Sequence, residues 1–232
     1  MNHLVFNEQD FADFSAQILE SNFLKGAERD VTLHNVLGRN GALVTDNNRF
    51  KQFSYIVKLG IKGDMQTNME AMRSFLATCK GMCRVEESQT PYIYRRAIFY
   101  KSFAPDKYDH LNGTVTLEFT AQPQKWLKDG ETAISFTNDG TLMNPCGQPS
   151  QPLIRVYGHG SFMIGNMEVT INEHTQAYID IDCEAMLCHC GAIRMGEYVE
   201  TANHEYPVLN PGANGITLSG VTLEITPRWF DI

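Results

Sequence analysis

The feature of this sequence that most restricts its fold is a repeated alternation of apolar and polar residues with a period of two. It runs through residues 55–61, 115–119, 179–183 and 221–225, where apolar side chains occupy every second position. This period places the apolar side chains on one face of a β-strand, and β-branched and aromatic residues favour strands. Clusters of Gly, Asn, Asp and Pro separate the segments at 38–41, 46–48, 138–140 and 210–215. Short strands separated by turns predict a mainly β protein with sandwich-like sheets.

Two glycine-containing segments predict connections between strands. Ile164-Gly165-Asn166-Met167 is typical of a two-residue hairpin turn, with Gly165 at the position that needs a positive φ. Gly158-His159-Gly160-Ser161 superficially resembles a glycine-rich hydrolase loop. Because it lies between two strand-like runs, we interpret it as a second hairpin connection.

One segment is helical instead. Thr67-x-x-Glu70 has the form of a capping box, Met69, Met72, Leu76 and Cys79 then recur at helical spacing, and Gly81 follows as a stop signal. We expect this apolar stripe to face the protein core. A groove for a binding partner is the alternative.

The chain divides in its middle. A polar, turn-rich stretch follows Pro123-Gln124-Lys125-Trp126 and ends near Pro149, after which strand-like sequence resumes at Leu153. We therefore expect two domains, residues 1–133 with the helix and residues 134–232 without one.

Composition excludes several classes of function. The 232 residues are 43% hydrophobic and 20% charged, which is sufficient for a sizeable core. The net charge of −8 argues against nucleic acid or an anionic membrane as a partner, because both require a basic face. The sequence shows no signal peptide and no apolar run that would span a bilayer, so we expect synthesis in a cytoplasm with six reduced cysteines.

The sharpest candidate for a metal site is Cys183 followed by Cys188-His189-Cys190. Thiolates and imidazoles bind zinc, but structural zinc sites use two well-separated short pairs. Here Cys79 and Cys83 would have to supply the second pair from a distant segment. Cys183 also continues the strand alternation as a small apolar residue, so we expect no metal and no cofactor.

Catalytic patterns are equally weak. The sequence contains no Gly-x-Ser-x-Gly elbow, no phosphate-binding P-loop and no dinucleotide-binding glycine pattern. Asp180 and Asp182 could act as paired carboxylates, but their alternation with Ile179 and Ile181 predicts a solvated outer face. We expect that the protein is not an enzyme.

Several segments, taken in order, resemble the distal tail (Dit) proteins of siphophages, a family of phage tail components. The resemblance covers nearly the whole chain. Its segments are Val36–Gly41, the strand Tyr55–Ile61, the helix Met65–Lys80, Val115–Pro123, Asn138–Thr141 followed by Gln151–Gly158, Pro207–Asn214 and Ile225–Trp229. The residues that match family-like structural motifs are Gly38, Arg39, Gly41, Pro123, Gly158, Pro211, Gly212, Asn214, Pro227, Arg228 and Trp229.

The resemblance implies a fold and a role. The fold is an N-terminal β-rich domain with one helix, residues 1–133, followed by a C-terminal galectin-like β-sandwich, residues 134–232. The first domain would form a hexameric ring at the virion tail tip, after synthesis in the bacterial host cytoplasm. The ring would join the tail tube protein to the tail-associated protein and the receptor-binding baseplate proteins. The galectin sugar motif His-x-Asn-Pro-Arg is absent, so the second domain would be architectural.

Aromatic residues leave two interpretations open. Phe50, Phe53, Tyr92, Tyr94, Arg95 and Phe99 could anchor a protein interface or belong to the core and surface of the first domain. The alternative function is a carbohydrate-binding module that attaches to the host cell wall. It would need exposed rings along a groove, for example Trp126, Tyr157 or Tyr178.

Overall fold

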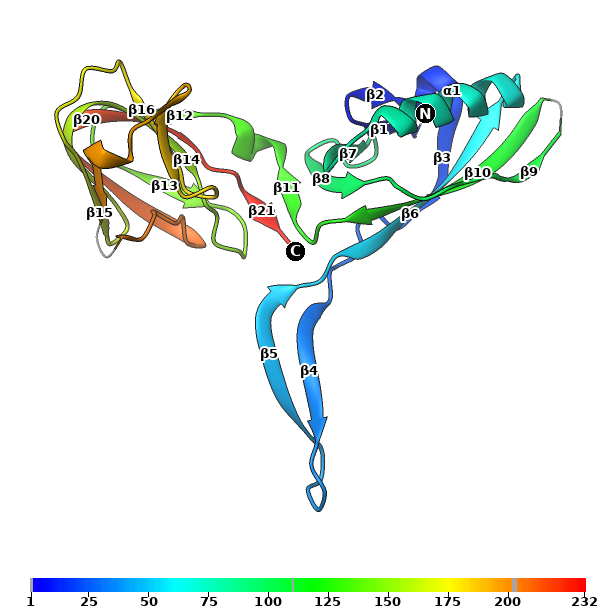
Figure 1. Ribbon diagram of the computed structural model, residues 1–232, viewed down its shortest axis with the longest axis horizontal. Helices are drawn as coiled ribbons and strands as arrows, with labels where there is room; N and C mark the ends of the chain where they lie inside the picture. Colours follow the sequence, from blue (N-terminus) through cyan, green and yellow to red (C-terminus); the bar gives the residue numbers. More distant parts are fainter. Residues whose placement is uncertain (1, 110, 202–203) are drawn as a thin grey trace. The chain divides into compact units, whose positions relative to one another are not determined.

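A computed structural model of the protein describes residues 2–109, 111–201 and 204–232. The chain divides into two compact units, the first comprising Met1–Lys125 with Ile232 and the second comprising Trp126–Asp231 (Figure 1). Antiparallel strands dominate both units, and the described residues contain a single α-helix. The expected mainly β fold with one helix is confirmed.

The first unit is built on one antiparallel sheet with the strand order β2-β1-β7-β8-β10-β6-β3, and β9 pairs with β10. The bounds are β1 Leu4–Phe6, β2 Gln9–Asp10, β3 Ala16–Ser21, β6 Phe53–Lys62, β7 Cys83–Glu87, β8 Ile93–Ile98, β9 Pro105–Tyr108 and β10 Asn112–Ala121. A short 3-10 helix, η1 Phe11–Phe14, lies between β2 and β3. The longest pairing joins β10 to β6 from Asn112 opposite Lys62 to Ala121 opposite Phe53.

The core of the first unit confirms the predicted alternation. Tyr55, Val57, Leu59 and Ile61 of β6 are buried, and so are Val115, Leu117 and Phe119 of β10. Tyr55 stands directly opposite Phe119 in the register, and their rings stack with centroids 5.5 Å apart. The pair therefore joins the two central strands on the core side of the sheet.

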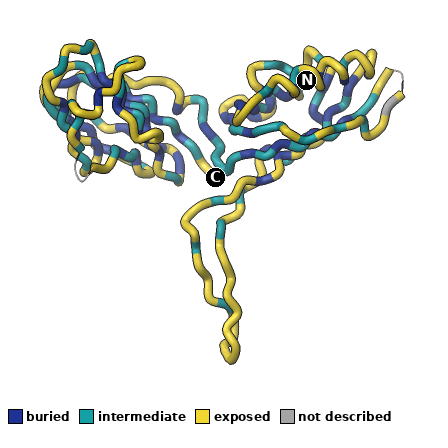
Figure 2. The backbone as a smooth tube through the Cα atoms, in the orientation of Figure 1, coloured by how far each residue is buried: buried dark blue, intermediate teal, exposed yellow. Residues whose placement is uncertain are grey.

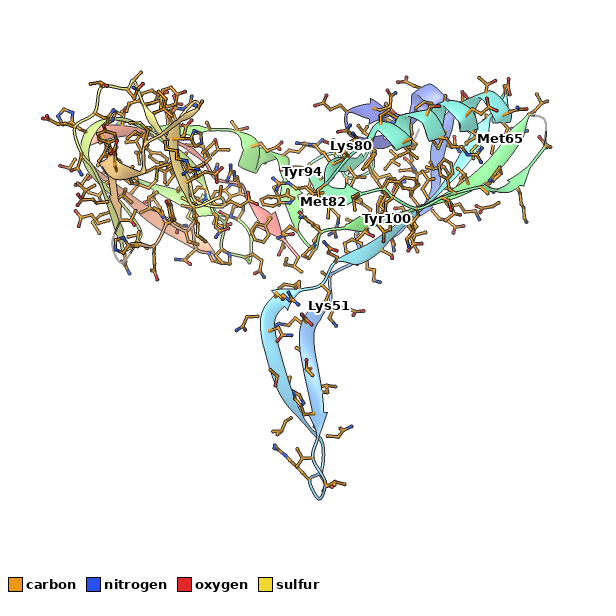
Figure 3. The ribbon with its side chains drawn as sticks, viewed as in Figure 1. Lys51, Met65, Lys80, Met82, Tyr94 and Tyr100 are labelled. Carbon is orange, nitrogen blue, oxygen red and sulfur yellow. The ribbon has the colours of Figure 1, made fainter. Side chains whose placement is uncertain are left out.

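Helix α1, Met65–Thr78, covers the sheet face that carries these side chains (Figure 1). Met69, Met72 and Leu76 are buried, so the predicted core-facing stripe is confirmed. In Figure 3 the labelled Met65 marks the start of the helix. Cys79 follows the helix in an extended conformation and does not extend the stripe.

The predicted start and stop of this helix are wrong in detail. Asp64 is the N-cap, and its carboxylate accepts hydrogen bonds from the backbone N of Thr67 at 3.1 Å and from Thr67 Oγ1 at 2.7 Å. An aspartate here satisfies an otherwise unpaired amide, so Thr67 lies inside the first turn instead of capping it. The helix ends at Thr78, before the expected stop at Gly81.

The second unit contains one sheet with the order β12-β20-β14-β16-β17-β18, in which β13 also pairs with β20, and β15 pairs with β14 and β19. The bounds are β11 Lys125–Leu127, β12 Ile134–Phe136, β13 Gly140–Asn144, β14 Leu153–Ile164, β15 Met167–Ile171, β16 Ile179–Asp182, β17 Leu187–Cys190, β18 Ile193–Arg194, β19 Val199–Thr201, β20 Gly212–Thr226 and β21 Phe230–Asp231. Two 3-10 helices, η2 Lys128–Glu131 and η3 Gly196–Tyr198, complete the unit.

The long strands β14 and β20 each pair with different neighbours along their two halves, so the sheet consists of two half-sheets that share these strands. The first half of β14 pairs with β16, and its second half pairs with β15. Likewise β20 pairs with β13 through its first half and with β12 through its second half. The ladder between β14 and β20 is interrupted between Gly158 and Ser161, so a bulge separates the two halves.

The prediction of a hairpin connection at Gly158–Ser161 is wrong, since all four residues lie inside β14. Gly158 has φ +89° and Gly160 has φ +140°. A Cβ on Gly160 would lie 2.1 Å from the carbonyl oxygen of Ser219 on β20. Glycine is thus required here because the two backbones approach too closely for a side chain.

The second unit contains its own cluster of buried apolar residues. Its buried residues include Ile154, Val156, Ile179, Ile181, Cys183, Val221, Leu223, Ile225 and Trp229. The turn at Gly165-Asn166 is confirmed, because Ile164 stands opposite Met167 and Gly165 has φ +60°.

Candidate interaction surface

A two-stranded hairpin leaves the first unit between β3 and β6. It consists of β4 Arg29–Asn35 and β5 Ala42–Phe50, and within the described residues these strands pair only with each other. Figure 1 shows the hairpin projecting away from the sheet of its unit, and Figure 2 shows it exposed over most of its length. Gly38, Arg39 and Gly41 form the turn at its tip, which agrees with a turn between strands.

One face of this hairpin carries four apolar residues that are exposed or half-buried, and Asn35 and Asp46 share that face with them. Leu33 stands opposite Val44, and each side chain is 63% exposed. Val31 lies two residues before Leu33 on the same face, and Ala42 lies two residues before Val44. We call Val31, Leu33, Ala42 and Val44 the hairpin face. An isolated two-stranded hairpin is at best marginally stable in water, so this face is suited to being covered by another surface.

Ion pairs hold the base of the hairpin. Arg49 Nε lies 2.7 Å from the carboxylate of Asp30, and Arg29 lies 3.2 Å from that of Asp46. The hydrogen bond from Arg49 lowers the pKa of Asp30. The turn expected at 46–48 is instead an irregularity inside β5, where Asn48 has φ +54°. Exposed pairs contribute little stability, and they mainly fix the geometry of the two strands.

A buried arginine anchors the chain that leads into the hairpin. Arg95 is fully buried and donates to the backbone carbonyls of Phe23 at 2.9 Å, Lys25 at 2.8 Å and Pro123 at 2.9 Å. Its guanidinium also lies 4.7 Å from the ring centroid of Phe53. Burial lowers the pKa of Arg95 to about 10, which leaves it protonated at neutral pH. Pro123, one of the motif residues, therefore acts here through its carbonyl oxygen.

Tyr92, Tyr94 and Phe99, which were considered with Arg95 as possible interface anchors, lie in different environments. Tyr94 is buried with Arg84 over its ring at 3.8 Å, whereas Tyr92 is 63% exposed. Phe99 is partly buried and its ring lies 5.1 Å from that of Phe119. Arg95 and Tyr94 are thus core residues instead of interface anchors.

In the second unit, Asn214 fixes the turn that precedes β20. Its side chain is buried, donates to the carbonyls of Asn210 at 2.8 Å and Gly212 at 3.1 Å, and accepts from the backbone N of Asn210 at 2.9 Å. A third donation, at 3.3 Å, reaches the carbonyl of Leu142 on β13. The Pro211-Gly212-x-Asn214 motif thus acts as a structural turn locked by one amide.

The Pro227-Arg228-Trp229 motif closes the same unit. Arg228 has φ +58° and donates to both carboxylate oxygens of Asp182. Trp229 is buried in the second core, and its backbone N would lie 2.3 Å from a Cβ on Gly130. The motif therefore attaches the end of β20 to the turn after β16 and to η2, within the second unit.

The prediction of a solvated pair of carboxylates is wrong. Asp180 is only 5% exposed and receives two hydrogen bonds from Arg155, at 2.7 and 2.9 Å. The hydrogen bonds from Arg228 lower the pKa of Asp182. Both aspartates are thus engaged in separate pairs with arginine, which suits a structural role better than acid–base chemistry.

The thiols do not form a metal centre. Cys183 and Cys188 are buried, and burial raises the pKa of Cys183 to about 12. Cys79 and Cys83 belong to the first unit. Across the part of the chain that the structure describes, no group of three or more His, Cys, Asp or Glu side chains could hold a metal ion. No helix among those residues has the length and apolar character needed to cross a membrane.

The rings named for a carbohydrate groove are not equivalent. Trp126 is buried and packs on Phe230 with ring centroids 5.2 Å apart, so it cannot line an exposed groove. Tyr157 and Tyr178 remain partly exposed, with ring centroids 6.4 Å apart. No pattern described in the sequence predicts the hairpin face, although Val31 and Leu33 alternate with polar residues before the turn at Gly38–Gly41.

Comparison with known proteins identifies the fold. No family model and no curated protein sequence matches the chain. Among solved structures, it is similar to the SPP1 Dit protein (gp 19.1), described as a paradigm of the hub adsorption apparatus in phages that infect Gram-positive bacteria, with a TM-score of 0.68, 10% identity and coverage of 97% of this chain and 98% of that one. It is also similar to a chain of the phage P2 baseplate in its activated conformation with Ca, with a TM-score of 0.53, 9% identity and 97% of each chain covered. The chain therefore has the fold of the distal tail hub proteins, as the sequence resemblance implied.

Proposed function

We propose that this chain is a structural, non-enzymatic protein of a siphophage tail tip, a distal tail protein whose copies close into a hexameric ring. The observation that supports this best is the fold shared with a phage hub protein over almost the full length of both chains. In the proposed role the ring joins the tail tube protein to the tail-associated protein and to the receptor-binding baseplate proteins.

The hairpin of the first unit supplies a means of assembly. Nothing within the described residues covers the exposed hairpin face, and a second copy of the chain would provide a cover. A contact between a protruding arm and a different surface of the next copy is heterologous, and heterologous contacts generate closed rings when the rotation closes. The first domain is therefore the proposed ring former. The second, which we propose to be a galectin-like sandwich, would point toward the baseplate proteins.

The mass of the full chain in solution tests this proposal. We expect multi-angle light scattering to give six times the 26.2 kDa chain mass. Replacing Leu33 and Val44 by Asp should shift the protein toward monomers, because charges would be buried in the contact. A matched control replaces Thr32 and Thr45 by Asp, since these residues stand opposite each other on the other face of the same hairpin.

The control should keep the assembled mass. A full-length chain that stays monomeric at all concentrations would contradict the ring. If the Leu33 and Val44 variant assembled like the control, the ring would have to close through another surface. The carbohydrate-binding module remains the competing function and predicts a monomer.

A further inference from the structure

The chain carries an asparagine directly before a glycine at Asn40-Gly41, Asn112-Gly113 and Asn214-Gly215. In such a pair the backbone nitrogen of the glycine can attack the side-chain carbonyl carbon of the asparagine, because glycine has no side chain to obstruct the approach. Asparagine is accordingly among the thermolabile residues of proteins. The structure places the three pairs in different environments, and these decide where the reaction can proceed.

Asn40-Gly41 lies at the tip of the hairpin formed by β4 and β5, at the end away from the sheet of the first unit (Figure 1, Figure 2). Asn40 is exposed, and no hydrogen bond to its side-chain amide occurs among the described residues. Gly41 has φ +79°, and a Cβ built on it would meet no other atom within 4 Å. The attacking nitrogen therefore lies in open space, where the backbone can rotate toward the amide at little cost.

Asn112-Gly113 is held in a strand. The backbone N of Asn112 donates to Asp109 Oδ1 at 2.7 Å, and both residues of the pair are in register with β6. A Cβ on Gly113 would lie 2.6 Å from the sulfur of Met65, so this glycine packs against the first residue of α1. An extended strand keeps ψ at about +135°, and rotating the glycine nitrogen toward the side chain would disrupt the ladder.

Asn214-Gly215 is buried. Asn214 is only 3% exposed, and its side-chain amide takes part in four hydrogen bonds, three as donor and one as acceptor. The carbonyl oxygen of Gly215 accepts a further hydrogen bond from the backbone N of Gly165 at 2.8 Å. Ring closure would leave buried polar groups without partners, which costs free energy, so this pair is protected as well.

We propose that Asn40 is a site of spontaneous deamidation in the unassembled chain, and that Asn112 and Asn214 are not. The nitrogen of Gly41 loses its proton to solvent base and bonds to Cγ of Asn40, the Cγ–Nδ2 bond breaks, and the amide leaves as ammonia. Water then opens the succinimide ring. Opening at Cγ gives aspartate, and opening at the main-chain carbonyl gives isoaspartate. This inference goes beyond the proposed assembly function and does not depend on it.

Either product changes the tip of the hairpin. It adds one negative charge beside Arg39 to a chain whose net charge is already −8. Isoaspartate also lengthens the main chain by one carbon, in a turn where Gly38 and Gly41 have φ +81° and +79°. The modification therefore alters both the charge and the geometry of the exposed end of the hairpin.

The test uses the full-length protein, held in mildly alkaline buffer at a dilution where light scattering gives the mass of one chain. The variant with Leu33 and Val44 replaced by Asp takes its place if the wild type stays assembled at every dilution. Peptide mapping by mass spectrometry then follows aspartate and isoaspartate at the three positions. We expect these products to accumulate at position 40 at least about tenfold faster than at position 112 or 214, because only the latter two require local unfolding. In urea the three rates should converge, since the protecting structure is lost.

Two glutamine variants form a matched pair. Asn40→Gln has a longer side chain that would have to close a larger ring, so the acidic species that isoelectric focusing detects in the aged protein should no longer appear. Asn112→Gln should leave the rate of their appearance unchanged. Equal rates at positions 40 and 112 in the folded chain would overturn the proposal, and so would acidic species that form as fast in Asn40→Gln as in the wild type. Light scattering on the same samples reports assembly separately, so failure of this site and failure of the ring are distinguishable.

Discussion

The guanidinium of Arg228 meets the carboxylate of Asp182 edge to edge, with Nη1 2.7 Å from Oδ1 and Nη2 3.0 Å from Oδ2. Arg228 has φ +58°, a conformation that costs energy for a residue with a side chain. The bidentate contact offsets that cost, and it ties the chain just before Trp229 to the turn after β16. Arg228, one of the family-like motif residues, thus has a defined structural role in the second unit.

Acid should weaken this contact. The hydrogen bonds from Arg228 lower the pKa of Asp182 in the folded protein, so its contribution to stability is complete above the unfolded pKa of about 4. That contribution is lost as the pH falls through the lower folded pKa. We expect Asp182→Asn to cost about 1–3 kcal/mol at pH 7. Urea unfolding across pH 2–7 should show that the gap between the variant and wild type narrows toward low pH, and a constant gap would contradict this assignment.

Arg95 should be among the residues of the first unit that are least tolerant of replacement. Arg95→Met removes the donor from three backbone carbonyls in the interior, at a cost of about 3 kcal/mol or more. Lysine cannot reproduce the fixed fork of the guanidinium, so Arg95→Lys should also be destabilised. Urea unfolding measures both losses. The exposed Arg39→Met is the control, and an equal loss in that variant would refute the role given to Arg95.

Leu76 tests the packing of α1. It is 3% exposed, so Leu76→Ala should lower the free energy of unfolding by about 2–5 kcal/mol through lost burial and a residual cavity. Ser74→Ala, at an exposed position of the same helix, should change it by less than about 0.5 kcal/mol. Thermal and urea unfolding give both values. Similar small losses in the two variants would mean that the helix does not cover the sheet as described.

Glycine at the bulge of β14 should be irreplaceable. Gly160→Ala would place a Cβ 2.1 Å from Ser219 O, so we expect a loss of about 3 kcal/mol or more, or an insoluble protein. Gly165→Ala is the matched control, because Gly165 also has a positive φ but a Cβ there would meet no other atom within 4 Å. That variant should lose about 1–2 kcal/mol from backbone strain alone. Melting temperatures of the two purified variants provide the comparison.

The strands of both cores and the buried stripe of the helix were predictable from the sequence, because alternation and helical spacing reflect which side chains are buried and which are exposed to solvent. It was harder to predict which of two neighbouring residues caps the helix. Asp64 displaced Thr67 as the helix cap, since either residue can accept a hydrogen bond from an unpaired amide of the first turn. Gly158 and Gly160 looked like turn residues, but the partner that requires glycine at position 160, Ser219, lies on a strand far along the chain.

Tertiary pairing also explains why the candidate surfaces were only partly visible in the sequence. Asp180 was expected to face solvent because its strand alternates, yet Arg155 on the neighbouring strand covers it. The apolar alternation at Val31 and Leu33 is the same signal that marks a buried strand. Only the structure shows that those residues have no core to face within their own hairpin.

β14 and β20 each take part in both halves of the second sheet, and this sharing determines the order in which the two units can fold during synthesis. Ile154 of β14 pairs with Ile225, and the intervening residues must be translated before the two can meet. At roughly 5–20 residues per second, that interval lasts on the order of several seconds. During it both half-sheets lack their shared strand, whereas the pairing of β6 with β10 is already available. We therefore expect the first unit to fold during synthesis, before β20 emerges and completes the sheet of the second unit.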